Sequence, residues 1–517
     1  HTLPPLPARS ALSVECVEGA VLRAPRTLLL DGVDLRLVGC TIIGKGRAIQ
    51  GHDSCIQVIA STFTGGGVRL WYGSHTNPRP CGSRPYISNA FYYSTFQNIA
   101  NGGSGGAVAL HFGLGLKGIP ATAFHSVSFE NISTGRSGGA VSIIYRDDTQ
   151  SASAIFVNTS FRHTACALAG GAVSLWYGRA AHACRATFRE VDFNVTTARQ
   201  SGGAVSLRYG GPVQKDSHVF RGVRFIQTQA GRNGGALSLV YSSGAHGSET
   251  SFSGAYFEQV RSTSGGGALF LYQPLDRLRR GRCLSPWAYE GLGTYPTFRY
   301  KTQVWIQQSQ FWEVGCVAQS CSGGVLFAIG GNVTVLDTTF SHRLPGPSAG
   351  LYGGVFYLGR SAALTLANVS VDQGRARPSE RGQLLYSDSL GPLDIGAGTV
   401  LIAGRKQEEQ TVLEVVQGGV VRWDPAASVE CPVGWWVENL SAPQPHIYPL
   451  VLDYSQDTDC RMNVSLQLFK CSACQPSHYS LALDRFSTSS PPRRSHDEVC
   501  HPCPYGAECT GGGRGLQ

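Results

Sequence analysis

Six cysteines lie near the C-terminal end of this 517-residue sequence: Cys460, Cys471, Cys474, Cys500, Cys503 and Cys509. Four of them form two Cys-x-x-Cys pairs, Cys471 with Cys474 and Cys500 with Cys503. Thiolates at that spacing can hold a zinc ion, and in an oxidising compartment the same thiols form disulfides instead. The two additional cysteines favour disulfides. We therefore expect no metal and no cofactor.

Other cysteines could close loops elsewhere in the chain, which holds 16 of them, an even number. Cys166 and Cys184 flank one copy of a repeated segment, and Cys316 and Cys321 precede another. Each pair is a disulfide candidate, although sequence alone does not place two Cα atoms within bonding distance. Four cysteines near the N-terminus allow three pairings: Cys16, Cys40, Cys55 and Cys81.

Seven Asn-x-Ser/Thr sequons accept N-glycans in a secreted protein: Asn131, Asn158, Asn194, Asn332, Asn368, Asn439 and Asn463. The first three lie at or near one strand in successive repeats, so we expect glycans along one side. With the even cysteine count they indicate an extracellular or cell-surface protein. No apolar run of about 18 residues predicts a membrane span. The chain opens without Met or an apolar signal region, so we expect a targeting segment to have been removed and the protein to continue past residue 517.

Few residues are arranged for catalysis, and none is assigned a catalytic role. Asp147 and Asp148 follow a repeated strand, and a solvated turn explains them best. The loop DRLRRGRC at 276–283 concentrates arginines; we favour a solvated insertion over a processing site or an anionic-glycan contact. Outward residues at one repeat position differ in type, which weakens the idea of a uniform ladder for sugar or ice: His111, Ile144, Trp176, Arg208 and Val240.

Composition indicates a folded protein of strands and turns. The sequence holds 65 Gly, 42% apolar and 15% charged residues, which is enough apolar material for a core. The net charge of +9 is a mild excess at this length, and the basic residues are scattered. A nucleic-acid partner is therefore not expected, because it would need them gathered on one face. Several domains or a repeat array must account for the length.

A repeat of about 32 residues organises the chain. A Gly-Gly pair recurs at steps of 33 and then 32, with its first residue at Gly105, Gly138, Gly170, Gly202, Gly234 and Gly266. Phe pairs five apart hold the same phase, as in Phe129, Phe161, Phe193, Phe225 and Phe257 for the second member. The segment at 273–300 reads as an insertion. Two independent markers in phase exclude a chance resemblance between copies.

The segment after each Gly pair has strand periodicity. In GGAVSLRY at 202–209, Val205, Leu207 and Tyr209 alternate with residues of the other face, such as Arg208. Glycines ahead of the strand supply a sharp corner and allow neighbouring backbones to approach closely. Propellers and leucine-rich repeats need signals that are missing. We predict an all-β fold, a right-handed parallel β-helix in which the Phe residues stack into an inner ladder.

The repeated GGA[VL] tetrapeptide, in phase with Phe segments, resembles the polymorphic outer-membrane proteins and related cell-surface β-helix adhesins. The FxxN motif of that family is not reproduced; the nearest matches are FEN at 129–131 and FN at 193–194. Residues 471–512 resemble the ephrin-receptor-like cysteine-rich module, on Cys471, Cys474, Cys500, Cys503, Cys509, Tyr479, Gly506 and Gly511. Together the resemblances imply an algal or protist surface or filament glycoprotein.

Three regions are expected: an N-terminal extension at 1–10, a β-helix at 11–430 and a cysteine-rich region at 431–517. The favoured function is a non-enzymatic structural or adhesive glycoprotein, a subunit of a cell-surface or extracellular filament assembled through β-helix ends or faces. Its expected partners are copies of itself or other surface proteins, with N-glycans and carbohydrate contact. The alternative is a pectate-lyase-like enzyme acting on extracellular polysaccharide, because the same fold hosts such enzymes.

Overall fold

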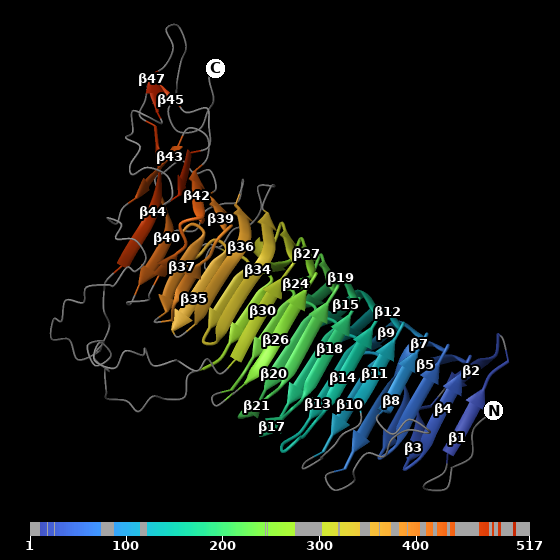
Figure 1. Cartoon of the computed structure of the whole chain (residues 1–517). Coiled ribbons are helices and arrows are strands. Elements are labelled where there is room, and N and C mark those ends of the chain that lie inside the picture. Colours follow the sequence, from blue (N-terminus) through green and yellow to red (C-terminus); the bar gives the residue numbers. More distant parts are fainter. Residues whose placement is uncertain are drawn as a thin grey trace. The chain divides into compact units, whose positions relative to one another are not determined.

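The computed structural model describes residues 11–73, 87–113, 121–274, 302–341, 352–373, 382–403, 410–431, 435–439, 465–487 and 500–502, apart from short gaps inside these ranges. Within them every regular element is a strand. The predicted parallel β-helix is confirmed: strands of successive coils pair in parallel and in register (Figure 1). The chain divides into two compact units, His1–Ser262 with Ala268–Phe270, and Thr263–Gly267 with Leu271–Gln517.

The first unit begins with short coils. Its first strands are β1 (Ala11–Glu15), β2 (Val21–Ala24), β3 (Leu28–Asp31), β4 (Asp34–Val38), β5 (Thr41–His52) and β6 (Cys55–Ile59). Ala11 pairs with Asp34, and Asp34 with Cys55, so the coil there is shorter than the later repeat. Residues 11–60 therefore form the first coils of the β-helix.

Each later coil contributes three strands. The strand after the Gly pair is β7 (Thr62–Tyr72), β10 (Val108–Phe112), β13 (Val141–Tyr145), β16 (Val173–Tyr177), β20 (Val205–Tyr209) and β25 (Leu237–Val240). The strand with the first Phe is β8 (Ile87–Tyr92), β11 (Ala121–His125), β14 (Ser153–Val157), β18 (Arg185–Arg189), β22 (Ser217–Arg221) and β26 (Ser248–Ser253). The strand with the second Phe is β9 (Thr95–Asn101), β12 (Ser128–Thr134), β15 (Ser160–Cys166) and β19 (Asp192–Ala198), and then the shorter β23 (Arg224–Ile226), β24 (Gln229–Ala230), β27 (Tyr256–Glu258) and β28 (Arg261–Ser262).

The two glycines of each pair have separate roles. Gly170 has a φ of 73°, a left-handed conformation that an L side chain rarely adopts, and all six predicted corner glycines share it. Gly171 instead lies against the next coil, where an added Cβ would sit 1.9 Å from the Gly203 carbonyl oxygen. The first glycine therefore turns the chain, and the second lets two backbones touch.

The interior is built from aromatic ladders. Phe129, Phe161 and Phe193 are fully buried and stack with ring centroids 4.8 and 5.0 Å apart, as predicted. A second ladder runs through the first Phe of each pair, and a third through Tyr145 and Tyr177. Offset stacking at this spacing contributes about 0.5–1.5 kcal/mol per pair beyond the burial of area. The in-register coils thus hold one another through identical side chains.

Two further corners of each coil carry non-glycine residues with positive φ. One corner holds Tyr93, Ser126, Asn158 and Glu190, and the other holds Asn98, Asn131, His163, Val195, Gln227 and Gln259. The first corner precedes the strand with the second Phe, and the second corner lies within that strand, as Asn131 does in β12. A minor two-stranded pairing joins β17 (Ala181–His182) to β21 (Val213–Gln214). Strand β29 (Leu269–Tyr272) lies where the two units divide.

The second unit continues the parallel pattern in its own coils, with β30 (Thr302–Gln307), β31 (Gln310–Trp312), β32 (Gly315–Cys316), β33 (Leu326–Ile329), β34 (Asn332–Ser341), β35 (Phe356–Arg360), β36 (Ala363–Asp372), β37 (Leu385–Ser389), β38 (Leu393–Ile395), β39 (Val400–Ile402), β40 (Gln410–Val416), β41 (Val421–Trp423) and β42 (Ser428–Cys431). The pairing turns antiparallel in β43 (Trp435–Asn439), β44 (Ser465–Ala473), β45 (His478–Tyr479), β46 (Asp484–Ser487) and β47 (His501–Pro502). The parallel ladder therefore ends with β42.

Candidate functional site

An aromatic stack lies on the outer face of the first unit. His52, Trp71 and His111 are the last outward-facing residues of β5, β7 and β10, and they are in register with one another. The His52 and Trp71 ring centroids are 4.9 Å apart, and those of Trp71 and His111 are 6.0 Å apart. Because parallel coils repeat at about 4.8 Å, side chains of one column stack automatically. The indole therefore stacks with one imidazole from the coil on either side.

Three arginines surround this stack. The Arg69 guanidinium carbon lies 4.1 Å from the centroid of the Trp71 ring, a cation–π contact. Arg47 reaches the backbone at Gly103, and Arg146 directly follows β13. None of the three is in an ion pair with another described residue. We call this set the cationic row: His52, Trp71, His111, Arg47, Arg69 and Arg146.

The row keeps its histidine neutral. Burial, and then the charges of Arg47 and Arg146, lower the pKa of His111 to about 4. Burial also lowers the pKa of the Arg47 guanidinium. Two polar atoms, Arg69 Nε and His111 Nε2, are buried without a hydrogen-bond partner. The row thus combines three guanidinium groups with two enclosed polar atoms that make no hydrogen bond.

Sequence reasoning found only part of this row. The five residues of the predicted outward position are in register as expected, and they are mixed in type. His52 and Trp71 belong to the same column, but the steps between coils are irregular there and the 32-residue period does not reach them. The letters LWY, present at 70–72 and again at 175–177, were the available signal.

A second cluster is sealed inside the first unit. The Tyr209 hydroxyl bonds to His218 Nε2, and the Cys184 amide donates to Asp216 Oδ1 at 2.8 Å. Asp216 Oδ2 and His218 Nδ1 are buried without a partner. Asp216 is 1% exposed and His218 is 0% exposed. We call Tyr209, Asp216 and His218 the inner cluster.

Burial shifts both titrating groups of the inner cluster toward their neutral forms. It raises the pKa of Asp216 to about 7, against the opposing hydrogen bonds from the Cys184 amide and Tyr209. It lowers the pKa of His218 to about 3. Shifted carboxyl groups mark many active sites, but a polymeric substrate cannot reach a group enclosed by stacked coils.

The structure settles several cysteine pairings. Cys316 bonds to Cys321 as predicted, and Cys16 bonds to Cys40. The predicted pairing of Cys166 with Cys184 is wrong, because both thiols are free and buried. Cys166 ends β15, whereas Cys184 precedes β18 in a different column of the coil. In-register stacking keeps those columns apart, whatever the separation in sequence.

The C-terminal cysteines are joined by disulfides. Cys474 bonds to Cys500, inside the segment that resembles the ephrin-receptor-like module. Cys471 bonds to Cys431, outside that segment, so the disulfide framework starts earlier than the resemblance implies. Cys460, Cys503, Cys509 and the glycines of the module lie outside the described residues. No group of metal-ligating side chains was found among the residues the structure describes.

The sequons differ in setting. Asn131, Asn158 and Asn368 are exposed and occupy left-handed corners. Asn194 and Asn332 are half-buried, and Asn332 Oδ1 is buried without a partner. Asn439 ends β43, and Asn463 lies outside the described residues. In the first unit, Asn131 and Asn158 occupy two neighbouring corners of the coil, and Asn194 directly precedes the corner residue Val195.

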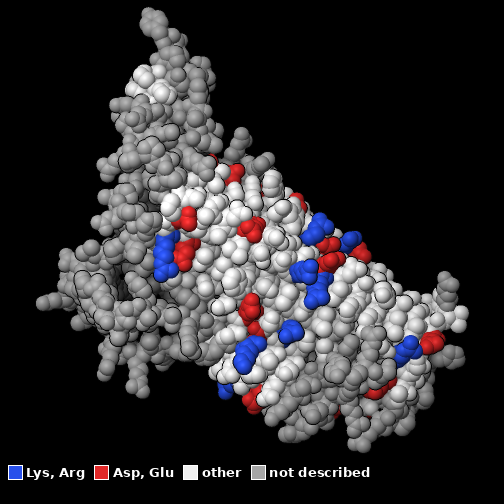
Figure 2. Space-filling model, viewed as in Figure 1, with Lys and Arg blue, Asp and Glu red and all other residues white. Residues whose placement is uncertain are grey.

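The other sequence candidates have simple outcomes. Asp147 Oδ1 accepts a hydrogen bond from the Arg179 amide at 2.7 Å, and Asp148 has a φ of 61°, so the pair forms a turn. The arginine loop at 276–283 lies outside the described residues. Among the described residues, no helix long and apolar enough to cross a membrane is found. On the face drawn in Figure 2, charges of both signs are interspersed and most of the described surface is uncharged.

Comparison of the sequence with protein-family models, curated proteins and solved structures gives no match.

Proposed function

We propose that this chain is a non-enzymatic structural or adhesive glycoprotein outside the cell, built to display a solenoid surface and to associate with copies of itself. The observation that carries this proposal is the combination of disulfides with sequon asparagines at exposed corners. Disulfides persist in oxidising compartments, and N-glycans are added on the secretory route. Both features point to the same side of the membrane.

The N-terminal coil supports association through an end. Strands β1, β2 and β3 each have a parallel partner on one side only, β4 or β5, among the described residues. Leu29 is 72% exposed and Val17 is 82% exposed beside this edge. An open strand edge next to exposed apolar side chains is a template for pairing with another chain. We call β1, β2 and β3 the N-terminal edge.

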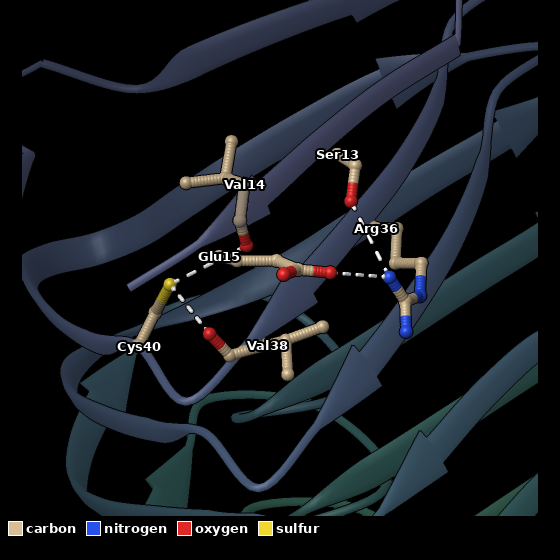
Figure 3. Close-up of polar contacts among 6 residues, drawn as sticks. All are labelled: Ser13, Val14, Glu15, Arg36, Val38 and Cys40. Carbon is tan, nitrogen blue, oxygen red and sulfur yellow. Dashed lines mark hydrogen bonds and ion pairs between the residues drawn. The ribbon is translucent and has the colours of Figure 1, made fainter. Parts of the chain in front are cut away.

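A disulfide fixes the conformation of the N-terminal edge. The Cys16–Cys40 disulfide ties the first coil to the second. Figure 3 shows the Cys40 sulfur beside the carbonyls of Val14 and Val38, and Arg36 reaching Glu15 at 2.8 Å. That exposed ion pair adds little stability. The covalent bond therefore does most to present the edge as a fixed surface.

The alternative function, a polysaccharide-degrading enzyme, has no specific observation in its favour. The carboxyl group with the most strongly raised pKa, Asp216, faces the interior. The outward acidic pair, Asp147 and Asp148, forms a turn held by the Arg179 amide. General acid–base catalysis needs carboxyl groups within reach of the substrate.

The test is expression with a secretion signal in eukaryotic cells, followed by glycosidase treatment and peptide mass spectrometry. We expect glycans on Asn131, Asn158 and Asn368, whose side chains are exposed, and no glycan on Asn332, whose half-buried side chain leaves less room for one. Unmodified asparagines at all three exposed corners, with reduced thiols in place of the observed disulfides, would exclude the secretory route.

Self-association is tested by analytical ultracentrifugation of the same protein. We expect association that depends on concentration and that Leu29→Lys weakens about tenfold or more, because a charge at an edge opposes strand pairing. Leu168→Lys is the matched control, since Leu168 is 38% exposed but lies away from the N-terminal edge. Equal effects of the two variants would argue against association through this edge.

A further inference from the structure

The N-terminal edge exposes the end of the hydrophobic core as well as a row of strand backbone. Leu22 of β2 is in register with Ile42, and this inward column continues into Phe63 and the ladder of second Phe residues. Ile42 is 4% exposed and Phe63 is 0% exposed, whereas Leu22 is 37% exposed because no further coil covers it among the described residues. Covering that end with another surface would be favourable in proportion to the apolar area removed from water.

The last coil of the parallel ladder, in the second unit, is covered by the chain itself. Strand β40 pairs with β44 and β42 pairs with β46, in both cases antiparallel. On the third side the Trp423 ring of β41 lies against Phe469 of β44, with ring centroids 4.9 Å apart, and both side chains are buried. Solenoids need such caps because their end coils otherwise expose unpaired backbone and apolar residues. In the described part of the chain, the last coil therefore offers no open three-sided edge on which the N-terminal edge of another copy could stack.

A second N-terminal edge is the surface that matches the first. When two identical coil ends meet, one copy is turned over, so the facing strands run in opposite directions. Antiparallel pairing is slightly more stable per residue than parallel pairing. A two-fold axis makes such a contact self-complementary and closed, since each copy contributes the same surface once.

Strand β3 is the most apolar part of this edge and can lie opposite its own copy. Leu29 faces outward and is exposed, whereas Leu30 faces the core and is buried. With the two-fold axis at Leu29, the two Leu29 side chains meet, and Leu28 lies opposite Leu30 of the other copy. Outward and inward residues then stay on matching faces, as strand pairing requires.

The charges of the edge suit this arrangement. Asp31 ends β3 and is exposed, so in the antiparallel pair the two carboxylates lie at opposite ends and do not meet. Because the coil has three sides, placing β3 against its own copy puts β1 of each chain opposite β2 of the other. Glu15 in β1 and Arg23 in β2 are both exposed and opposite in charge. Opposite charges across an interface favour the correct pairing over others.

We propose that two copies of this chain join head to head, N-terminal edge against N-terminal edge, into a closed pair in which β3 of one copy lies antiparallel to β3 of the other. This inference rests on the proposed self-association and specifies its partner and geometry. The closed pair covers both open core ends at once and leaves no N-terminal edge for a third copy. Association through this edge therefore stops at two chains.

The test combines sedimentation of the unmodified chain with a cysteine placed on the edge. Analytical ultracentrifugation over a wide range of concentration should show single chains and pairs, and nothing larger. On mild oxidation, Leu29→Cys should link two chains by a disulfide, because opposed residues of antiparallel strands have Cβ atoms about 4.5–5.5 Å apart. Leu168→Cys is the matched control, since Leu168 is exposed on the same unit away from this edge. The linked yield of Leu29→Cys should be about tenfold higher or more, because the closed pair holds its two thiols together.

The outcomes distinguish this inference from the proposed self-association. Polymers that lengthen with concentration, or equal linking of Leu29→Cys and Leu168→Cys, would overturn the closed pair and leave association of copies standing. A chain that stays monomeric at every concentration would overturn both, and a Leu29→Cys thiol that resists alkylation in that monomer would show that another segment covers the edge. Should Leu29→Cys misfold, sedimentation still decides, because only the closed pair predicts a limit of two chains that Leu29→Lys shifts toward one.

Discussion

For the inner cluster, we predict that the stabilities of two variants, each compared with the original chain, change with pH in opposite directions. Asp216→Asn removes the titrating carboxyl and keeps an oxygen for the Cys184 amide. His218→Thr removes the imidazole and places the residue of the next coil, Thr250, at the equivalent position. Each variant leaves one titrating group of the pair in place. The remaining group then determines how local stability depends on pH.

The expected size follows from the pKa values. Asp216 has a pKa of about 7 when folded against an ordinary 3.8, and this difference corresponds to about 4 kcal/mol. The raised pKa stabilises the fold at low pH, and that stabilisation is lost as pH rises from about 4 to 7. His218, at about 3 against 6.5, contributes about 5 kcal/mol in the opposite sense. Its stabilisation is present above pH 6.5 and is lost as pH falls toward 3.

In the original chain the two contributions nearly cancel between about pH 4 and 6.5, because folding moves one proton from the imidazole to the carboxyl. Asp216→Asn should therefore become more stable relative to the original chain as pH rises through that window. His218→Thr should become less stable over the same window. Thr250→Val, in the same inward column, should show a difference that does not depend on pH.

Hydrogen exchange at the amides of β20 and β22, measured at several pH values, gives the local opening free energy. It suits a solenoid because such arrays need not unfold in one step. The quantity compared is each variant minus the original chain, so that all other titrating groups cancel. Slopes of the same sign for Asp216→Asn and His218→Thr, or no slope in either, would show that the proton assignment is wrong.

Three further predictions concern packing. Gly171→Ala should destabilise the fold by about 3 kcal/mol or more, because its Cβ would lie 1.9 Å from a backbone oxygen, whereas Gly102→Ala, with open space, should be nearly neutral in a denaturant titration. Phe161→Ala should cost about 3–5 kcal/mol, since the ring is fully buried in its ladder, and a loss below 1 kcal/mol would contradict that packing. Alkylation of the native protein should spare Cys166 and Cys184, because burial raises the pKa of both thiols; rapid labelling without denaturant would place them at the surface.

Much of the fold could be predicted because the repeat is written into the sequence. Gly pairs, alternating strand residues and phased Phe residues each have a local meaning, and a constant period brings like residues together in space. Phe129, Phe161 and Phe193 could therefore be placed in one ladder before any coordinates were known. The structure assigned the two predicted roles of the Gly pair to separate residues, since Gly170 turns the chain and Gly171 touches the next coil.

The contacts in the candidate sites could not be predicted from the repeat period of the sequence. His52 and Trp71 stack on His111 because strand register, which sequence spacing hides in the first coils, puts them in one column. Asp216 and His218 meet Tyr209 because all three face inward at one corner.

The sequence by itself determined the winding of the chain, since side-chain alternation and a regular period are local properties. Only the tertiary structure decided which cysteines bond and which polar groups meet. Cys166 and Cys184 show why: they are close in sequence, but a coil sends them to different columns, and covalent reach depends on distance in space.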